Sequence, residues 1–339
     1  MGDRELKFYE PSNQVIYKLI GIVKCFTFLP HSLLQLRHVK ITGVAKGKNS
    51  HFILHYIGTG ENLNYIKNIC FSKVINEKRM LCSLFKIKIE IDSIHDHPVF
   101  VEVNRLLRSF VPDHGFETDP WIRQKIFFKG DTYQKRKRKI KDLCRKVIKH
   151  KFQFKIVSDQ VSLTQFYNDF YVPYITYRFG DATHLRSFGE IRNTVKNGFL
   201  LKVFDENIWI ASVVCEIRKK EIKAFAFGII PDYNYHLKRG ALLATYFFLF
   251  KWAQENNMET IDLMRSRPHL DDGVYEHKRR WASKTIKDCW HHTIIKIFIP
   301  KDNEMPSFIN RLLVWNKNEF VELERLLYRN QKTSNAMIY

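Results

Sequence analysis

The sequence predicts an α+β fold in which a mixed sheet is flanked by helices. In the second half, a helix, a run of three strands, a long helix and a further strand follow one another, and this order is typical of such folds. The 27 Phe and 15 Tyr residues suit strand-rich, aromatic interiors. A hydrophobic content of 45% excludes a disordered chain, and 339 residues are enough for two domains.

The first 110 residues are expected to be rich in strands. Apolar and β-branched residues alternate in short runs there, and the turn Gly58–Gly60 closes one of them. A second turn, residues 111–115, is a candidate domain boundary. We expect strands over residues 51–57, 80–91 and 121–128, a short helix over 61–70, and a helix over 98–110 that begins at Pro98.

In the second half, the residues that end helices and strands are easier to recognise. Gly198 is placed to end a helix, and the polar residues 205–207 and 218–220 separate apolar runs. The predicted elements are a strand over 152–158, helices over 163–174 and 188–197, strands over 199–204, 208–217 and 221–229, a long helix over 242–252 and a strand over 260–264.

The formal net charge of +21 is concentrated in one run. Residues 135–155 hold eleven Lys and Arg against the single acid Asp142. Apolar side chains recur there at helical spacing, which predicts an amphipathic helix with a basic face. That face is either a solvated surface or the contact for an anionic partner: a phosphorylated cofactor, RNA or an anionic membrane.

Cysteine and histidine spacing gives no sign of a metal. The six cysteines are scattered without a CxxC pair, which favours reduced thiols, and His95–Pro98 reads as a turn. The apolar stretch 15–29 is short and is interrupted by Lys18 and Lys24. With no signal peptide at the start, we expect a cytoplasmic protein without stable membrane insertion or a bound metal.

The loop after the strand 260–264 is the densest polar segment. It places Arg, Ser, Asp, Gly and His residues directly after a buried helix and strand and ends at Trp281. Polar loops at strand ends are where α/β folds commonly hold their active sites. We therefore expect the functional site between residues 265 and 281.

The residues of this loop and its surroundings resemble a known family. The matching positions are Trp252, Ala253, Asp262, Arg265, Ser266, Asp272, Gly273, Lys278, Arg280 and Trp281, with Tyr133, Phe166, Tyr167, Tyr171–Tyr174 and Arg178 upstream. Together they resemble the FemAB-like acyltransferases of the GNAT superfamily, including the acetyltransferases of polysaccharide biosynthesis. The resemblance covers residues 121–296. It implies two GNAT-like lobes that share a cleft: a degenerate lobe over 1–115 and an acyltransferase domain over 116–339.

Acyl transfer to an amine needs a neutral nucleophile, an oxyanion donor and a path for the proton. Asp272 is the candidate to orient or deprotonate the amine, and Tyr275 to protonate the leaving group. Lys278 or Arg280 is the candidate to hold donor phosphate or the oxyanion. The plainer alternatives are that Asp272 only shapes a turn, and that the two cations lie on a solvated helix face.

Four further residues are candidates for substrate binding. Arg265 and Ser266 follow the strand end, where side chains face a cleft in such folds. Tyr174 and Arg178 are expected across that cleft, because tyrosine offers area with a hydroxyl and arginine holds carboxylate or phosphate. Core packing is the alternative for Tyr174.

The segment before the long helix matches a coenzyme A site only in part. GNAT enzymes hold the pyrophosphate on backbone N–H groups at the start of this helix. Here Leu237 replaces the usual Gln or Arg, and the candidate cofactor-binding residues are Lys238, Arg239, Gly240 and Ala241. An ordinary glycine before a helix is the alternative.

Two classes of function follow. The first is an N-acyltransferase that carries an acyl group, from acetyl-CoA in the simplest case, to an amine of a small acceptor such as an amino sugar or amino acid. In a variant of it the donor is an aminoacyl-tRNA and the basic run contacts RNA. The second is a non-catalytic protein that binds nucleic acid or a membrane surface. Binding of RNA or a membrane through the basic run 135–155 should collapse at raised ionic strength, whereas binding of a small donor in a cleft should change much less.

Overall fold

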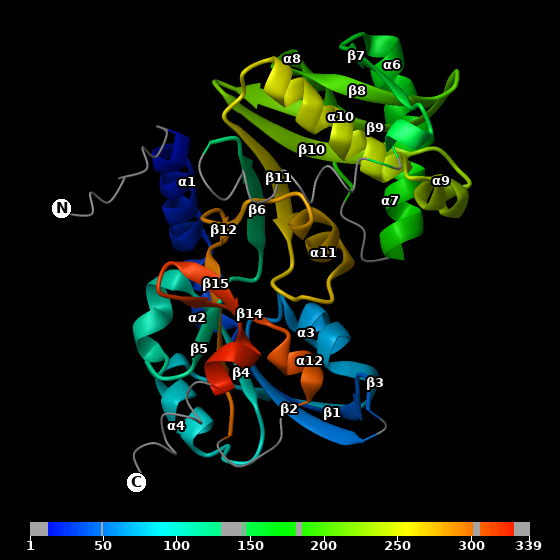
Figure 1. Ribbon diagram of the computed structural model, residues 1–339. Coiled ribbons are helices and arrows are strands. Elements are labelled where there is room, and N and C mark those ends of the chain that lie inside the picture. Colours follow the sequence, from blue (N-terminus) through cyan, green and yellow to red (C-terminus); the bar gives the residue numbers. More distant parts are fainter. Residues whose placement is uncertain are drawn as a thin grey trace, which may run out of the picture. The chain divides into compact units, whose positions relative to one another are not determined.

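The computed structural model describes residues 13–48, 50–129, 145, 147–180, 185–300 and 306–328 (Figure 1). Most of the basic run 135–155 therefore lies outside the described residues, as does Tyr133. The chain forms two compact units. Unit 1 contains Met1–Ile122, Ser266–Tyr275 and Ile286–Tyr339, and unit 2 contains Arg123–Arg265 and Glu276–Thr285.

Unit 1 is built on a six-stranded mixed sheet with the order β3-β1-β2-β4-β13-β5. Only β2 and β4 run parallel, and the other neighbours are antiparallel. A separate hairpin joins β14 to β15. The strands are β1 (Arg37–Ala45), β2 (His51–Gly58), β3 (Phe71–Leu81), β4 (Val99–Asn104), β5 (Phe116–Thr118), β13 (Thr293–Phe298), β14 (Leu313–Asn316) and β15 (Glu319–Glu322).

Alternation along its strands gives this sheet two apolar faces. Phe100 packs in one core with Ile295, whereas Val101 packs in the other with Ile294. The first core also takes side chains from α3 and α12, and the second from α4. The helices are α1 (Asn13–Thr27), α2 (Leu29–Leu34), α3 (Leu63–Cys70), α4 (Ile87–Asp92) and α12 (Ser307–Asn310), with 3₁₀ turns at Leu84–Lys86 and Arg105–Phe110.

Unit 2 holds a seven-stranded sheet with the order β12-β6-β11-β10-β9-β8-β7. Strands β7 to β10 form an antiparallel meander, and β10 pairs with β11 in parallel. The strands are β6 (Ile122–Phe127), β7 (Gln153–Val157), β8 (Gly198–Asp205), β9 (Ile208–Arg218), β10 (Glu221–Ile229), β11 (Thr260–Ser266) and β12 (Lys284–Lys287).

Helices cover both faces of the unit 2 sheet. Leu201 and Val213 face α10, whereas their neighbours Leu200 and Val214 face the helices that precede the meander. In Figure 1, α10 lies across the strands β8 to β10. The helices are α6 (Gln160–Gln165), a π-helical segment (Phe166–Tyr171), α7 (Val172–Phe179), α8 (Phe188–Lys196), α9 (Tyr233–Arg239), α10 (Ala241–Glu255) and α11 (Gly273–Arg279).

The predicted α+β class, with mixed sheets flanked by helices, is confirmed, as is the order of helix, meander, long helix and strand. Within the described ranges, the structure has no helix that is long and apolar enough to cross a membrane.

Two predicted elements were wrong. Residues 80–91 are not one strand, because β3 ends at Leu81 and Ile87 and Ile91, four residues apart, are the buried face of α4. Residues 98–110 do not form one helix. The segment Val99–Asn104 is β4, whose six residues are all buried because it lies between β2 and β13.

The division of the chain also differs from the predicted one. The passage from unit 1 to unit 2 at residues 122 and 123 lies near the expected boundary at 115. The segment after residue 285, however, returns to unit 1, because β13 pairs with β4 and β5 there.

Candidate functional site

The parallel pair β10 and β11 separates part of the way along unit 2. Their ladder joins Glu221–Lys223 to Thr260–Asp262 and then ends, although the strands continue to Ile229 and Ser266. A register shift between Ala224 and Ala226 marks the same level on the other edge of β10. Beyond this level the ladder between the two strands does not continue.

Asp262 fixes the turn of β11 at the divergence. Its carboxylate is fully buried, and Oδ2 lies 2.5 Å from Nη2 of Arg123 and 3.7 Å from Nζ of Lys125. Its Oδ1 accepts a hydrogen bond of 2.8 Å from the backbone N–H of Met264, which has a φ of 63°. Since β-strand backbone does not adopt positive φ, this bond supports a local break in the strand.

An aromatic cluster packs against β10 beyond the divergence. It consists of Phe227 on β10, Tyr246 on α10, His277 on α11 and Trp281 just after α11, and we call it the Tyr246 cluster. Tyr246 stacks on Phe227 with ring centroids 4.8 Å apart and on Trp281 at 5.6 Å. The ring of His277 meets Tyr246 edge-on at 4.8 Å.

Two nitrogen atoms in the Tyr246 cluster are buried and lack hydrogen-bond partners among the described residues. They are Nε2 of His277 and Nε1 of Trp281. Buried polar atoms are almost always paired, so each of these two nitrogens is a position that water or a ligand could complete. Tryptophan can only donate there, whereas a neutral imidazole can accept.

The charge state of His277 follows from its surroundings. Burial lowers the pKa of His277 to about 4. Three nearby cations act in the same direction: Arg178, Arg280 and Lys278. The imidazole is therefore neutral at pH 7 and lies in a positive potential, which suits a group that meets an anionic ligand.

The predicted substrate residues Tyr174 and Arg178 lie close together on α7. Tyr174 is 2% exposed, and its hydroxyl accepts a hydrogen bond of 3.1 Å from Nη1 of Arg178. Arg178 belongs to the last turn of α7 and is exposed. Arg178 is also near enough to Tyr246 to oppose the rise that burial gives to the pKa of that phenol.

The other predicted residues of unit 2 have evident structural contacts. Lys278 is 7% exposed, and its Nζ donates a hydrogen bond of 2.7 Å to the carbonyl of Arg265. Arg280 is exposed and forms an i,i+4 ion pair of 2.8 Å with Glu276. The side chain of Arg265 is exposed.

Asp272, Tyr275 and Ser266 belong to unit 1. Asp272 Oδ1 accepts a hydrogen bond of 2.7 Å from the backbone N–H of Tyr275, a capping contact in the first turn of α11. The ring of Tyr275 is buried against Leu270 and Leu313, and Ser266 is 1% exposed. These contacts account for Asp272 and Tyr275 as parts of the turn into α11.

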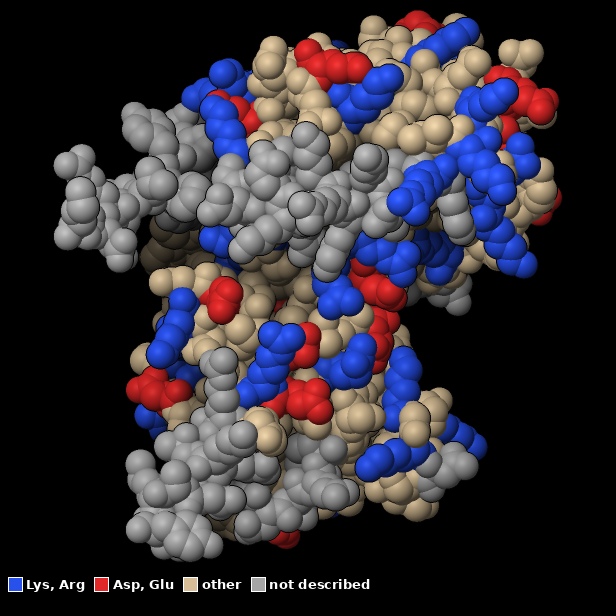
Figure 2. Space-filling model, viewed as in Figure 1, with Lys and Arg blue, Asp and Glu red and all other residues tan. Residues whose placement is uncertain are grey.

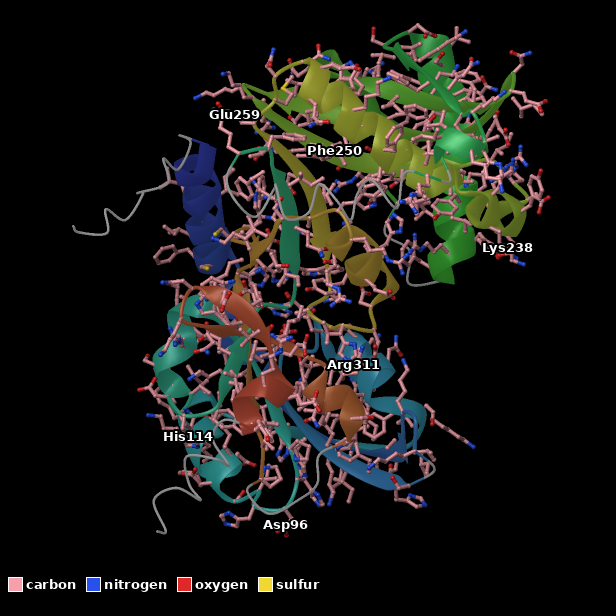
Figure 3. The ribbon with its side chains drawn as sticks, in the orientation of Figure 1. Asp96, His114, Lys238, Phe250, Glu259 and Arg311 are labelled. Carbon is pink, nitrogen blue, oxygen red and sulfur yellow. The ribbon has the colours of Figure 1, made fainter. Side chains whose placement is uncertain are left out.

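Asp272 also lines a cavity of unit 1 with a volume of about 370 Å³. Arg311, labelled in Figure 3, lines the same cavity and pairs with Asp271 at 2.6 Å. With Lys46, these residues give the lining both signs of charge.

A second hollow, of about 620 Å³, lies at the start of β11 in unit 2. Lys129 and Lys220 line it, and both pair with the exposed Glu259, which is labelled in Figure 3. This is the opposite end of β11 from the divergence. None of the predicted site residues lines the hollow.

The expected phosphate turn contains a helix. α9 runs up to Arg239, and Gly240, with a φ of 108°, donates its N–H to the carbonyls of His236 and Leu237. Nε and Nη2 of Arg239 both bind the carboxylate of Asp205, and Ala241 is fully buried. Of the four predicted cofactor residues, Lys238 has the exposed charge (Figure 3).

Positive charge gathers on this face of unit 2. Figure 2 shows Lys and Arg side chains over α7 and α9, where Arg178 and Lys238 are exposed. The described residues thus supply a cationic surface without the basic run 135–155.

Sequence reasoning missed His277 and Tyr246. His277 lies on α11, and Trp281 follows it by four residues, just after the helix ends at Arg279. Tyr246 was part of an apolar helix and carried no sign of a polar neighbour. The short separation of His277 and Trp281 in the sequence was the one available signal.

No protein-family model and no curated protein sequence matches the chain. Among solved structures, the chain is similar to L-PGS from Bacillus licheniformis, with a TM-score of 0.35 and 9% identity over 84% of this chain and 93% of that one. It is also similar to FemX, with a TM-score of 0.37 and 9% identity over 86% and 97% of the two chains. A GCN5-related N-acetyltransferase from Kribbella flavida gives 0.29 and 10% over 83% and 94%. These scores and identities are too low to assign the chain to a family.

Proposed function

We propose that unit 2 carries an N-acyltransferase that moves an acyl group from a phosphate-bearing donor, in the simplest case acetyl-CoA, to an amine of a small acceptor. The observation that supports it is the Tyr246 cluster, in which the buried nitrogens of His277 and Trp281 lack partners and cations lie nearby. The sequence resemblance to FemAB-like acyltransferases points to the same chemistry.

The proposal gives each group a role that its chemistry allows. The amine nitrogen attacks the acyl carbon, and the Trp281 N–H donates to the carbonyl oxygen as negative charge develops there. The carbon–sulfur bond of the donor breaks, and the amine gives up its proton to Nε2 of His277. The departing thiolate then takes a proton from the imidazolium or from water.

The donor supplies the condition under which His277 works as a base. In the absence of ligand, burial and nearby cations keep its pKa at about 4, so the imidazole is a weak base. Donor phosphates bound by Arg178 and Lys238 would offset that positive potential and raise the pKa toward the working pH. Acceptor activation then depends on a bound donor.

The acceptor is proposed to be a small amine, such as an amino sugar or amino acid. A tRNA-borne aminoacyl group is the alternative donor. The cationic face over α7 and α9 would serve either donor, because both carry phosphates.

The first experiment is calorimetric titration of the purified chain with acetyl-CoA, and with deacylated and aminoacylated tRNA pools, at low and raised ionic strength. We expect saturable binding of acetyl-CoA that persists at the higher salt. Arg178→Ala should weaken it about tenfold, the value of one charge-assisted contact. Arg192→Ala, an exposed arginine on α8, is the matched control and should leave it unchanged.

Turnover separates binding from chemistry. His277→Asn should bind acetyl-CoA normally but acylate a panel of amines about 10²- to 10⁴-fold more slowly. Salt-sensitive binding that prefers aminoacylated to deacylated tRNA would indicate that the donor is an aminoacyl-tRNA. If neither donor binds, or if His277→Asn keeps its full rate, the proposal fails.

A further inference from the structure

A second cluster of ligand-type side chains lies in unit 1, apart from the residues used above. Glu61, His291 and His292 each present one donor atom, and the three atoms lie within 4.8 Å of one another. Glu61 follows the turn after β2, whereas the histidines immediately precede β13. Two imidazoles and a carboxylate, brought together from distant parts of the sequence, are a donor set that proteins use for transition metals.

The ring of His292 is held in place from several directions. It is 7% exposed, stacks on Phe28 with centroids 4.3 Å apart, and lies parallel to the ring of His291 at 5.4 Å. Its Nε2 is 3.2 Å from Oε1 of Glu61. A ligand whose orientation is fixed before the metal arrives loses little entropy on binding.

The backbone of the turn is fixed as well. The N–H of Arg105 donates to the carbonyl of His292 at 2.8 Å, and Nε of Arg105 donates to the carbonyl of His291 at 2.9 Å. The Thr293 hydroxyl lies 3.0 Å from Nδ1 of His291, a contact of the kind that sets the orientation of ligating histidines. Both histidines are thus placed by contacts outside the triad.

The nearby positive charge is compensated. Nη2 of Arg105 lies 2.8 Å from Oδ1 of Asp119, which is 1% exposed. A cation at the triad would therefore meet a neutral ion pair and the carboxylate of Glu61, whose side chain is 30% exposed. The exposed side of Glu61 also provides an entry path.

We propose that Glu61, His291 and His292 form a binding site for a divalent transition-metal ion of the Zn²⁺ class. Three protein ligands at about 2.0–2.2 Å would leave a fourth position of a tetrahedron for water or a ligand atom. The present contact between Glu61 and His292 is that of a hydrogen bond, and a metal would replace its proton.

Such an ion would tie the loop between β2 and α3 to the turn before β13. The residue after Glu61, Asn62, is buried and donates from its N–H and its Nδ2 to Glu102 at 3.1 Å each. Its Oδ1 accepts a hydrogen bond of 2.8 Å from Nη1 of Arg267. Metal binding at Glu61 would therefore stabilise a buried polar network that already joins three segments of unit 1.

The test uses the full chain, freed of metal with a chelator and titrated with Zn²⁺ alone. We expect one equivalent to bind and the Tm of the chain to rise with Zn²⁺ concentration, since binding to the folded state stabilises it. Glu61→Gln keeps a hydrogen-bond partner for His292 but removes the charged ligand, and it should weaken Zn²⁺ binding about 100-fold or more. His291→Ala should do the same.

Two control variants separate this site from other donors. His95→Ala removes an exposed histidine of the same unit, and Cys289→Ser removes an exposed thiol near the turn. Both should bind Zn²⁺ as the parent chain does. Unchanged binding in Glu61→Gln and His291→Ala, or loss of binding in Cys289→Ser, would overturn the proposed ligands. If no Zn²⁺ binds stoichiometrically, the proposed site does not exist, and Glu61 and His292 form only a hydrogen bond. This result would not depend on whether the chain transfers acyl groups.

Discussion

A buried ammonium group holds the end of β11. Nζ of Lys278 donates to the carbonyl of Arg265 at 2.7 Å, and only 7% of the residue is exposed. Hydrogen bonds from charged groups contribute about 1.5–3 kcal/mol to the free energy of unfolding. Lys278 therefore acts on the path of β11 beyond the divergence and adds its charge to the surroundings of His277.

Replacing Lys278 by Met should lower the free energy of unfolding by about 2 kcal/mol, because the Arg265 carbonyl loses its donor. Urea unfolding of the variant measures the change. Lys284→Met, at an exposed position in β12, should stay within about 0.5 kcal/mol of the parent. If the Lys278→Met variant is as stable as the parent but loses all acyl transfer, Lys278 has a catalytic role and not a structural one.

The sequence indicated the loop and several cations of the candidate site, and it missed the neutral base. Arg178 and Lys278 could be named because charged residues beside aromatic or apolar runs are visible in the sequence. The low pKa of His277 arises from burial and from cations on other elements, so it depends on tertiary packing. Asp272 was easy to name from the sequence but its role was not, since an Asp before a glycine is as typical of a capping turn as of a catalytic carboxylate. In the structure it makes a capping contact.

Among the elements, β6 and β11 share a buried ion pair. Arg123 on β6 and Asp262 on β11 are 8% and 0% exposed, with their charged atoms 2.5 Å apart. The aspartate also supports the positive φ of Met264, so it couples the pairing of the strands to the point where β10 and β11 separate. Removing one partner of such a pair leaves a buried charge without compensation.

Asp262→Leu alone should destabilise the chain by about 3–5 kcal/mol because the buried guanidinium of Arg123 then loses the carboxylate that lies 2.5 Å from it. The double variant Arg123→Met/Asp262→Leu should recover a large part of that loss, because no buried charge remains. Chemical denaturation of the four chains of this cycle gives the coupling energy. Additive effects of the two changes would mean that the pair has no special role in the fold.

Hydrophobic periodicity predicted the elements correctly where the pattern was strong and turns marked its ends. The meander β8–β10 and the helix α10 carry strong patterns and clear turns, and they lie where expected. Residues 98–110 were harder, because a fully buried strand such as β4 has no polar side to alternate with. The helical pattern of α4 was hidden because the adjoining β3 shares its apolar and basic composition.

At the scale of the whole molecule, unit 1 is assembled from three segments of the chain. β13 lies between β4 and β5, and all six of its residues are buried. Pairing between segments so far apart leaves no mark in local sequence, which is why residues 286–339 were assigned to the C-terminal domain. The position of a strand in the sequence is local information, but its partners in the sheet are not.

A chain that stops after residue 285 should therefore lose the fold of unit 1. β4 would then have no partner on one side, and Ile294, Ile295 and Ile297 would be missing from both cores. Limited proteolysis should cleave the shortened chain within residues 37–122 while fragments of unit 2 persist. Protection of residues 37–122 in the shortened chain would contradict this account of the sheet.

The place of β13 has a consequence for the order in which the protein is made. A ribosome delivers β1 to β4 first and then the whole of unit 2, and only afterwards the strand that completes the first sheet. Throughout that interval β4, an apolar strand, offers an open edge of the kind to which other chains add. Most of unit 1 thus precedes unit 2 in the chain but becomes native after it, and we expect nascent chains to need protection at β4 until β13 is released.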